Sequence, residues 1–220
     1  MTAARPLLLV GAGGFGRATA SAAAVCPEWT VLGFCDDDPA RHGIVVDGLP
    51  VLGPAETVHR HPEAAVVLCT GSPRNFGSRA ALADRLALPP DRYGRVVHPA
   101  AAIAPGTVLG PGTVLLAGAV VTSPQPVGAH VAVMPQVVLT HDDEVGDFVT
   151  LASRVALGGG VVVEPGAYVG AGGLVREGLT IGAGALVGMG SVVLTDVPAG
   201  QVWAGNPARP LRVKAGVPAA

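Results

Sequence analysis

Residues 103–121 read IAPGTVLGPGTVLLAGAVV, and an aliphatic residue returns at every sixth position of this stretch. The same spacing continues from Val97 to Val193 without a slip. An α-helix repeats every 3.6 residues and a β-strand every two, so neither accounts for a period of six. A solenoid of hexapeptides does, because each unit supplies one short strand and one turn, and three units close a triangular coil.

The other positions of the hexad fit the same solenoid. The residue four places after the aliphatic one is often small or β-branched, as at Thr113 and Ala119. Gly and Pro recur in pairs such as Pro105-Gly106, where a corner needs a positive or a fixed φ angle. We therefore predict a parallel β-helix from residue 97 to residue 198, with the aliphatic side chains inside.

The composition bounds the class of protein. The 220 residues fit one or two domains, and half of them are hydrophobic although only 4% are aromatic. A formal net charge of -2 with few basic residues argues against nucleic acid as a partner. No stretch is long enough to cross a bilayer, and the apolar run at residues 7–10 is too short for a signal peptide. We expect a soluble, cytoplasmic protein that has no membrane partner.

The cysteines carry no recognisable chemistry. Cys26, Cys35 and Cys69 all lie in the first third of the chain, without the spacing of a metal site or a redox motif. We expect them to be buried small apolar residues in a reducing compartment.

Residues 1–96 have the pattern of a small Rossmann-like α/β domain. The run Leu7–Val10 predicts a buried strand that leads through a glycine loop into an Ala-rich helix. Gly11, Gly13 and Gly16 have the G-x-G-x-x-G spacing. The first glycine permits a tight turn, the second lets a phosphate approach the backbone, and the third lets the helix and the strand pack closely.

Two further strands are predicted to bring polar residues to the same edge of the sheet. Residues 31–35 end at Asp36 and Asp37, where an acidic side chain commonly binds ribose hydroxyls. Residues 65–69 end at Thr70-Gly71, a second turn. A glycine loop alone also fits a tight turn without a ligand. Because the segment is about half of a two-lobed dinucleotide domain, it favours a ligand of mononucleotide size.

The densest polar cluster of the predicted β-helix is Thr-His-Asp-Asp-Glu at residues 140–144. His141 takes a corner position, where its side chain faces outward. A neighbouring carboxylate, such as that of Asp142, can orient the imidazole and raise its basicity, which suits a general base near neutral pH. A lone histidine is more often structural or solvated, and we interpret His98 and His130 in that way.

The later corners and the end of the chain contain no ionisable cluster of this kind. Glycine-rich corners at residues 158–160, 170–173 and 188–190 expose backbone amides that could hold a thioester oxygen or a pantetheine amide. Residues 199–220 are predicted to form a cap and a tail, because the open end of a solenoid must be covered.

Taken in order, these motifs resemble those of the sugar O-acyltransferase family. The family includes sialic-acid O-acetyltransferases of the NeuD type and UDP-4-amino-sugar N-acetyltransferases of the PglD type. The resemblance covers nearly the whole chain: the glycine loop, the hexapeptide repeats, the string from Val138 to Phe148 around His141-Asp142, and the Gly-Asn-Pro-Ala-Arg ending at residues 205–209.

The resemblance implies a homotrimer of left-handed β-helices with acetyl-CoA in the groove between adjacent subunits, and no metal. It assigns the catalytic base to His141 and the supporting carboxylate to Asp142. A sugar or nucleotide-sugar acceptor would be bound by Gly13, Gly14, Phe15, Asp36, Asp37 and Gly71. Coenzyme A would be bound by Thr150 and by the backbone of Ala171 and Met189.

The mechanism that follows is a direct transfer. Neutral His141 removes a proton from an amine or a hydroxyl of the acceptor, which attacks the acyl-CoA thioester while corner amides stabilise the oxyanion. Two departures from the family affect the acyl pocket. Thr150 stands where members often have a second histidine, and an asparagine common in the family is absent around residues 134–136. The acyl group and the acceptor therefore stay open, with acetyl as the default.

Several other functions compete with this interpretation. A hydratase of the carbonic anhydrase kind needs three histidines around zinc, and the predicted coils have no close pair. An NAD-dependent oxidoreductase would leave the whole solenoid unexplained. A non-catalytic, nucleotide-binding trimeric scaffold and an acyltransferase that acts on a non-sugar small molecule both remain open.

Overall fold

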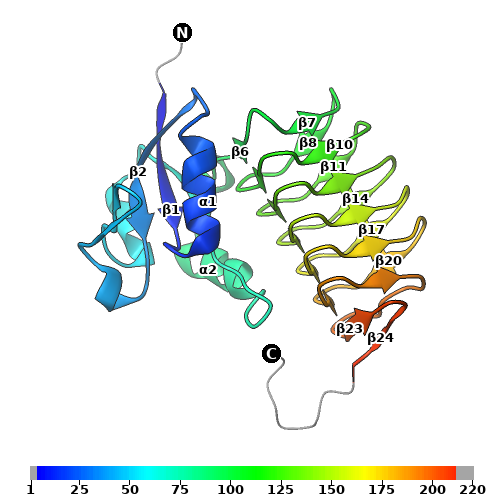
Figure 1. Cartoon of the computed structure of the whole chain (residues 1–220). Coiled ribbons are helices and arrows are strands. Elements are labelled where there is room, and N and C mark those ends of the chain that lie inside the picture. Colours follow the sequence, from blue (N-terminus) through cyan, green and yellow to red (C-terminus); the bar gives the residue numbers. More distant parts are fainter. Residues whose placement is uncertain (1–3, 212–220) are drawn as a thin grey trace.

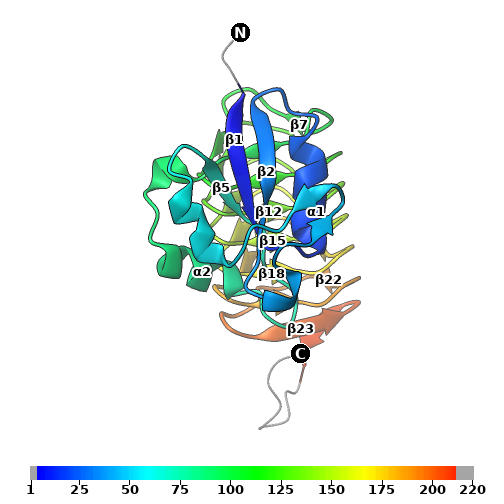
Figure 2. The same cartoon turned by 90° about the vertical axis from the view of Figure 1, so that its left-hand side faces the viewer.

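In the computed structural model, which describes residues 4–211, a small α/β domain precedes a three-sided β-helix (Figure 1). The α/β domain has a parallel sheet of three strands in the order β2–β1–β5. Figure 2 shows these strands side by side, with the coils of the β-helix stacked behind them. The elements of this domain are β1 (Arg5–Val10), α1 (Gly14–Ala23), β2 (Trp29–Cys35), η1 (Pro39–Arg41), β3 (Val45–Val46), β4 (Leu49–Pro50), η2 (Ala55–Arg60), β5 (Ala65–Leu68), α2 (Ser78–Leu86) and η3 (Pro90–Arg92).

Strand β1 is the centre of the sheet, so both of its faces are covered. Leu7 and Leu9 pack in one apolar cluster with α1 and with residues of the first coils of the β-helix, such as Val114. Leu8 and Val10 pack in a second cluster with α2 on the other face. A continuous apolar run is what a central parallel strand requires, because successive side chains point to opposite faces. The three cysteines are buried and free, and their burial confirms that prediction.

The β-helix consists of two-residue strands that form three parallel sheets, with each strand paired to the one 18 residues later, as in Val121↔Leu139. Its first sheet contains β6 (Val96–Val97), β9 (Val114–Leu115), β12 (Ala132–Val133), β15 (Thr150–Leu151), β18 (Tyr168–Val169) and β21 (Leu186–Val187). The second contains β7 (Ala102–Ile103), β10 (Val120–Val121), β13 (Val138–Leu139), β16 (Ala156–Leu157), β19 (Leu174–Val175) and β22 (Val192–Val193). The third contains β8 (Val108–Leu109), β11 (Pro126–Val127), β14 (Glu144–Val145), β17 (Val162–Val163) and β20 (Thr180–Ile181).

The predicted inward positions are confirmed. The aliphatic residues at every sixth place from Leu115 to Val193 are buried and form one continuous core. Those at the first coil, Val97, Ile103 and Leu109, are partly buried because no coil covers them from below. The small or β-branched residue four places later is buried as well, as at Thr113 and Ala119. Each hexad therefore contributes two side chains to the core, which explains why so few aromatic residues are needed.

The corners differ between the middle of the β-helix and its ends. Most corners place a glycine in the left-handed region, for example Gly112 and Gly160. Five consecutive repeats in the middle use other residues there, with φ between 54° and 64°: His130, Gln136, Asp142, Phe148 and Arg154. A left-handed residue other than glycine costs free energy, and such residues gather where function requires a side chain. Left-handed corner residues other than glycine therefore distinguish the middle coils from the ends of the β-helix.

One buried arginine joins the two domains. Arg79, in the first turn of α2, is 1% exposed, and its guanidinium donates to the carbonyl oxygen of Thr70 in its own domain at 2.9 Å. Across the domain boundary it donates to the carbonyl oxygens of His130, Phe148 and Val149 and to Oγ1 of Thr150. Burial lowers the pKa of Arg79 to about 10. The guanidinium therefore stays charged at neutral pH and is satisfied by neutral acceptors.

His130 lies beside this arginine and is buried, not solvated. Its ring stacks on Phe148 with centroids 4.9 Å apart and meets Tyr93 edge-on at 4.4 Å. Burial first, and then the charge of Arg79, lower the pKa of His130 to about 4. The corner position was predicted correctly, but the ring is a packing element of the domain boundary.

Because His130 is buried in its neutral form, we expect it to make the free energy of unfolding depend on pH. Between pH 6.5 and about 4 the unfolded chain binds a proton that the folded chain does not, so the free energy of unfolding falls as the pH falls. We expect His130→Phe, which keeps the aromatic stack, to remove this part of the pH dependence. Urea unfolding at pH 7, 5.5 and 4.5 measures it, with exposed His59→Gln as the control. An unchanged pH dependence in His130→Phe would contradict the assignment.

The ends of the β-helix differ slightly from the expected boundaries. Strand β6 begins at Val96 and already pairs with Val114, so the solenoid starts one residue earlier than predicted. The cap is an antiparallel pair, β23 (Val202–Gly205) and β24 (Ala208–Pro210), added to the first sheet. Residues 212–220, the predicted tail, lie outside the described residues. No helix within residues 4–211 has the length and apolar character needed to cross a membrane.

Candidate active site

The glycine loop after β1 is built by close contacts that exclude side chains. Gly11 has φ of 109°, and a Cβ there would lie 2.8 Å from the carbonyl oxygen of Cys69. A Cβ on Gly16 would overlap the carbonyl oxygen of Gly11, so the first turn of α1 rests directly on the loop. These two glycines are required by packing. A Cβ on Gly13 or Gly14 would meet nothing within 4 Å, so the backbone between them is open to a ligand.

The open backbone is also the start of helix α1. Gly13 is the N-cap and provides no side-chain cap, and the first turn contains no acidic residue. The amides at such a helix start favour an anion, and a phosphate is the common choice. The predicted role of the loop is therefore compatible with its geometry.

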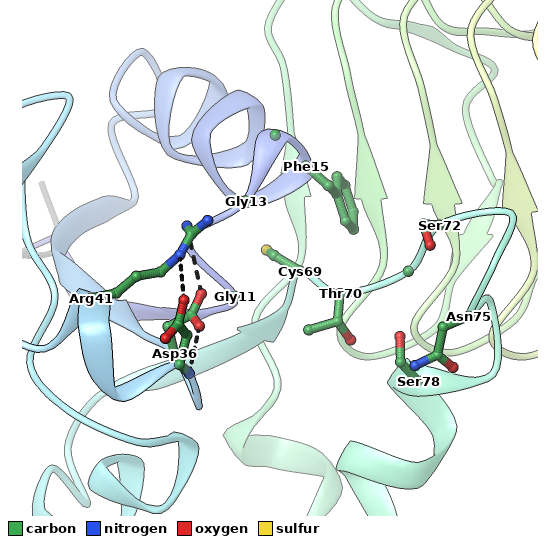
Figure 3. A pocket seen from close by; sticks show the side chains of 13 residues that line it. Gly11, Gly13, Phe15, Asp36, Arg41, Cys69, Thr70, Ser72, Asn75 and Ser78 are labelled. Carbon is green, nitrogen blue, oxygen red and sulfur yellow. Dashed lines mark hydrogen bonds and ion pairs between the residues drawn. The ribbon is translucent and has the colours of Figure 1, made fainter.

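The loop forms one wall of a pocket of about 450 Å³ at the carboxyl edge of the sheet. Figure 3 shows Arg41 and Asp36 on one side, Ser72, Asn75 and Ser78 on the other, and Cys69 with Thr70 between them. Of the predicted acceptor-binding residues, the pocket lining contains Gly13, Gly14, Phe15, Asp36 and Gly71. Burial raises the pKa of the Cys69 thiol to about 12, so the floor of the pocket is neutral.

Asp36 holds the loop in place. Its Oδ2 accepts from the N–H of Ala12 at 2.8 Å and its Oδ1 accepts from the N–H of Asp38 at 3.0 Å. Arg41 donates to the carbonyl oxygen of Ala12 at 2.9 Å and lies 3.9 Å from the carboxylate of Asp36. Each oxygen of Asp36 thus already accepts one backbone N–H, so the carboxylate supports the loop, and a contact with a ribose hydroxyl stays a prediction.

Asp37 does not line this pocket but a neighbouring hollow, which shares Thr70, Asn75 and Ser78 with it. Its carboxylate accepts from the N–H of Ala55 at 3.0 Å and forms an ion pair with Arg85 at 2.6 Å. Burial acts to raise the pKa of Asp37, but these two partners outweigh it and lower the pKa. The structure therefore separates two neighbouring aspartates that the sequence analysis grouped together.

The predicted acceptor site omitted several residues of the pocket lining, of which three carry a charge or an unpaired hydroxyl into it. Arg41 brings a positive charge to the lining, and the hydroxyls of Thr70 and Ser78 are buried without a hydrogen-bond partner. Unpaired hydroxyls in a pocket are suited to a polar ligand, because a buried polar group without a partner is costly. Only the Thr70-Gly71 turn was visible as a sequence signal. Arg41 and Ser78 lie 37 residues apart in the sequence, and only the parallel sheet brings their two loops together.

His141 and Asp142 form the predicted pair. Nδ1 of His141 lies 2.8 Å from Oδ2 of Asp142, and the two side chains are 69% and 84% exposed. The ring rests on Gly159 of the next coil, where a Cβ would overlap the imidazole. When Nδ1–H donates to the carboxylate, Nε2 keeps its lone pair and can accept a proton. The arrangement has the chemistry of a general base.

The predicted coenzyme A residues fall in two places. Ala171 and Met189 lie on the same corner of successive coils, where the N–H of Gly190 donates to the carbonyl oxygen of Ala171 at 2.8 Å. Met189 is 79% exposed. Thr150, in contrast, is buried against the α/β domain, and its Oγ1 accepts from Arg79 at 2.7 Å.

Within one chain the pocket and the base lie on different sides of the β-helix. Arg79 and the apolar cluster around α1 hold the α/β domain against the sheet that contains β9, β12 and β15. His141 lies between β13 and β14, at the corner where the other two sheets meet. In a three-sided coil that corner is opposite the first sheet. Among residues 4–211, no three His, Cys, Asp or Glu side chains gather in a way that could hold a metal ion.

Comparisons with known proteins agree with this fold. Residues 6–74 match the PglD N-terminal domain family. The acetyltransferase domain of PglB from Neisseria gonorrhoeae FA1090 has a TM-score of 0.82 at 27% identity, over 94% of this chain and 100% of that one. No curated protein matches the chain.

Two other solved structures are similar over the same length. A mutant of GDP-perosamine N-acetyltransferase from Caulobacter crescentus, in complex with CoA and GDP-perosamine, has a TM-score of 0.82 at 28% identity, with 94% and 96% of the two chains covered. WeeI from Acinetobacter baumannii AYE has a TM-score of 0.78 at 28% identity, with 93% and 99% covered.

The fold and the site together define this protein as an acyl-CoA-dependent acyltransferase of the hexapeptide-repeat class, built on a left-handed β-helix. Within that class, residues 6–74 match the PglD N-terminal domain, and the whole chain is similar in architecture to the acetyltransferase domain of PglB and to GDP-perosamine N-acetyltransferase.

Proposed function

We propose that this protein transfers an acetyl group from acetyl-CoA to the amino group of a sugar that is linked to a nucleotide. The observation that carries the proposal is the exposed His141–Asp142 pair at 2.8 Å, on the same chain as a pocket with an open helix start. The similar Caulobacter crescentus enzyme was solved with CoA and GDP-perosamine, in forms where one histidine is replaced by Ala or Asn.

The chemistry follows from these residues. The phosphates of the nucleotide lie at Gly13 and Gly14, with the charge of Arg41 nearby. Nε2 of His141 takes a proton as the sugar amine attacks the thioester carbonyl, and Asp142 stabilises the imidazolium that forms. The tetrahedral intermediate collapses to the amide, and the thiolate of coenzyme A leaves.

The active form is proposed to be a homotrimer. In one chain, His141 lies at the corner opposite the sheet that carries the α/β domain, so a second copy must bring a pocket to each base. Leu174 on β19 and Met189, in the turn that leads into the neighbouring strand β22, expose apolar side chains, as residues covered by another subunit would. A groove between two subunits would also place Ala171 and Met189 of one subunit where coenzyme A can reach the base of the other.

The experiment is thiol release from acetyl-CoA with a panel of acceptors. The panel contains UDP- and GDP-linked 4-amino sugars, the matching free amino sugars, a sialic acid and a simple amine. We expect release with a nucleotide-linked amino sugar and much less with the free sugar, because the phosphate site is then empty. Equal rates with free and nucleotide-linked sugars would contradict the role of the pocket. Bound acetyl-CoA without release to any acceptor would favour a non-catalytic scaffold or a different acceptor.

A further inference from the structure

Asp143 is a buried carboxylate directly after the His141–Asp142 pair. It is 1% exposed, in contrast to its two exposed neighbours. Its Oδ2 accepts from the N–H of Thr140 at 2.8 Å and its Oδ1 accepts from the N–H of Val161 at 2.9 Å. The side chain thus points into the corner from which His141 points out.

The two donors belong to the two segments that determine where the imidazole lies. Thr140 directly precedes His141. Val161 directly follows residues 158–160, a run of three glycines that contains Gly159, on which the ring rests, and Gly160, whose N–H donates to the carbonyl oxygen of His141 at 2.8 Å. Glycines have more backbone freedom to lose than other residues, so this support is loose unless a neighbour holds it. The carboxylate of Asp143 ties both segments together.

The preceding coil also supports the corner at Asp143. The backbone N–H of Asp143 donates to Oε1 of Gln125 at 3.0 Å, one coil earlier. Gln125, Asp143 and Val161 are therefore linked at intervals of 18 residues, through three successive coils.

Only a carboxylate satisfies this position. It offers two acceptor oxygens for two N–H donors, whereas the amide of Asn offers one acceptor and one further donor. Burial raises the pKa of Asp143, and the neighbouring His141 and Asp142 act on it in opposite directions, His141 lowering it and Asp142 raising it. Keeping a costly buried carboxylate here is explained by the two bonds that it makes.

We infer that Asp143 is a positioning residue for the catalytic base: it holds the His141 corner and the glycine support in one geometry. The inference rests on the proposed function for its kinetic consequence, but the position of the ring is measurable without any substrate.

The kinetic test compares Asp143→Asn with Thr113→Val. Thr113 is a matched control, because it is also buried and its Oγ1 accepts from the N–H of Val131, 18 residues later, at 3.0 Å. We expect kcat of Asp143→Asn to fall about 10- to 100-fold with little change in KM for acetyl-CoA, since a small displacement of a catalytic group has effects of this size. Thr113→Val should keep the kcat of the native protein.

A second readout does not depend on activity. In protein labelled with ¹⁵N-histidine, the ring signals of His141 are identified by their absence from His141→Ala. We expect these signals to shift or broaden in Asp143→Asn and to stay in place in Thr113→Val. If the native protein transfers no acyl group, the proposed function fails, whereas the position of the ring is still tested here.

Folded Asp143→Asn with native kcat and unmoved His141 signals would overturn the inference. Should Asp143→Asn not fold, Asp143→Ser removes the carboxylate without adding a buried amide donor. We then expect the same loss of kcat and the same shift of the His141 signals. Native kcat and unmoved signals in folded Asp143→Ser would overturn the inference equally.

Discussion

Replacing His141 by Ala is expected to lower kcat for acyl transfer about 1,000-fold, because a positioned general base contributes about 10²- to 10⁴-fold to such a step. The amine would then lose its proton only to water or buffer. The fold should not change, since the side chain is 69% exposed and its ring rests on a glycine of the next coil.

The measurement is thiol release at saturating acetyl-CoA, together with thermal unfolding and the size of the assembly. His59→Ala is the control, because His59 is an exposed histidine of η2 in the α/β domain that is absent from the pocket lining. We expect His59→Ala to retain native kcat. Full turnover in His141→Ala, with the fold intact, would remove this residue from the mechanism and leave the pocket without a base.

Replacing Arg79 by Met is expected to lower the free energy of unfolding by about 3 kcal/mol or more. Methionine fills similar space but donates no hydrogen bond, so the carbonyls of Thr70, His130 and Phe148 and the hydroxyl of Thr150 lose a donor, whereas the carbonyl of Val149 keeps the N–H of Ala132. A buried acceptor left without a partner costs about 1–3 kcal/mol. The relief of no longer burying a charge offsets only part of this.

Urea unfolding followed by circular dichroism measures this effect. Arg17→Met is the control: Arg17 pairs with Asp47 on the surface, and both side chains are about half exposed, so its loss should leave the unfolding transition almost unchanged. Because Arg79 bridges the domains, we also expect the α/β domain of Arg79→Met to unfold before the β-helix, as two transitions. A single native-like transition would show that the apolar contacts around α1 suffice to join the domains.

The arginine also changes how the Thr150 departure is understood. In the sequence, Thr150 is a missing histidine in a predicted acyl pocket. In the structure its hydroxyl accepts from Arg79, so the residue belongs to the domain boundary of its own chain. A contact with coenzyme A stays a prediction, and it would have to come from the exposed part of a side chain that is almost fully buried.

The features that the sequence predicted correctly are those that depend on local spacing. The hexapeptide period determines the β-helix, because every sixth side chain must enter the coil whatever surrounds it. The glycine loop depends on three residues within six positions, Gly11, Gly13 and Gly16, and His141 meets its carboxylate at the next residue. Each of these patterns is complete within a short segment, so the sequence is sufficient to identify it.

Only the tertiary structure determines the contacts between distant segments. The bonds of Arg79 to the β-helix cross 51 to 71 residues, and nothing in its local sequence distinguishes it from a surface arginine of a helix. The different partners of Asp36 and Asp37, and the inward direction of Asp143 beside the outward His141, depend on which backbone amides lie within reach after folding. A side chain's partner is determined by where the coils and the sheet bring other segments, and that information is absent from any single stretch of the chain.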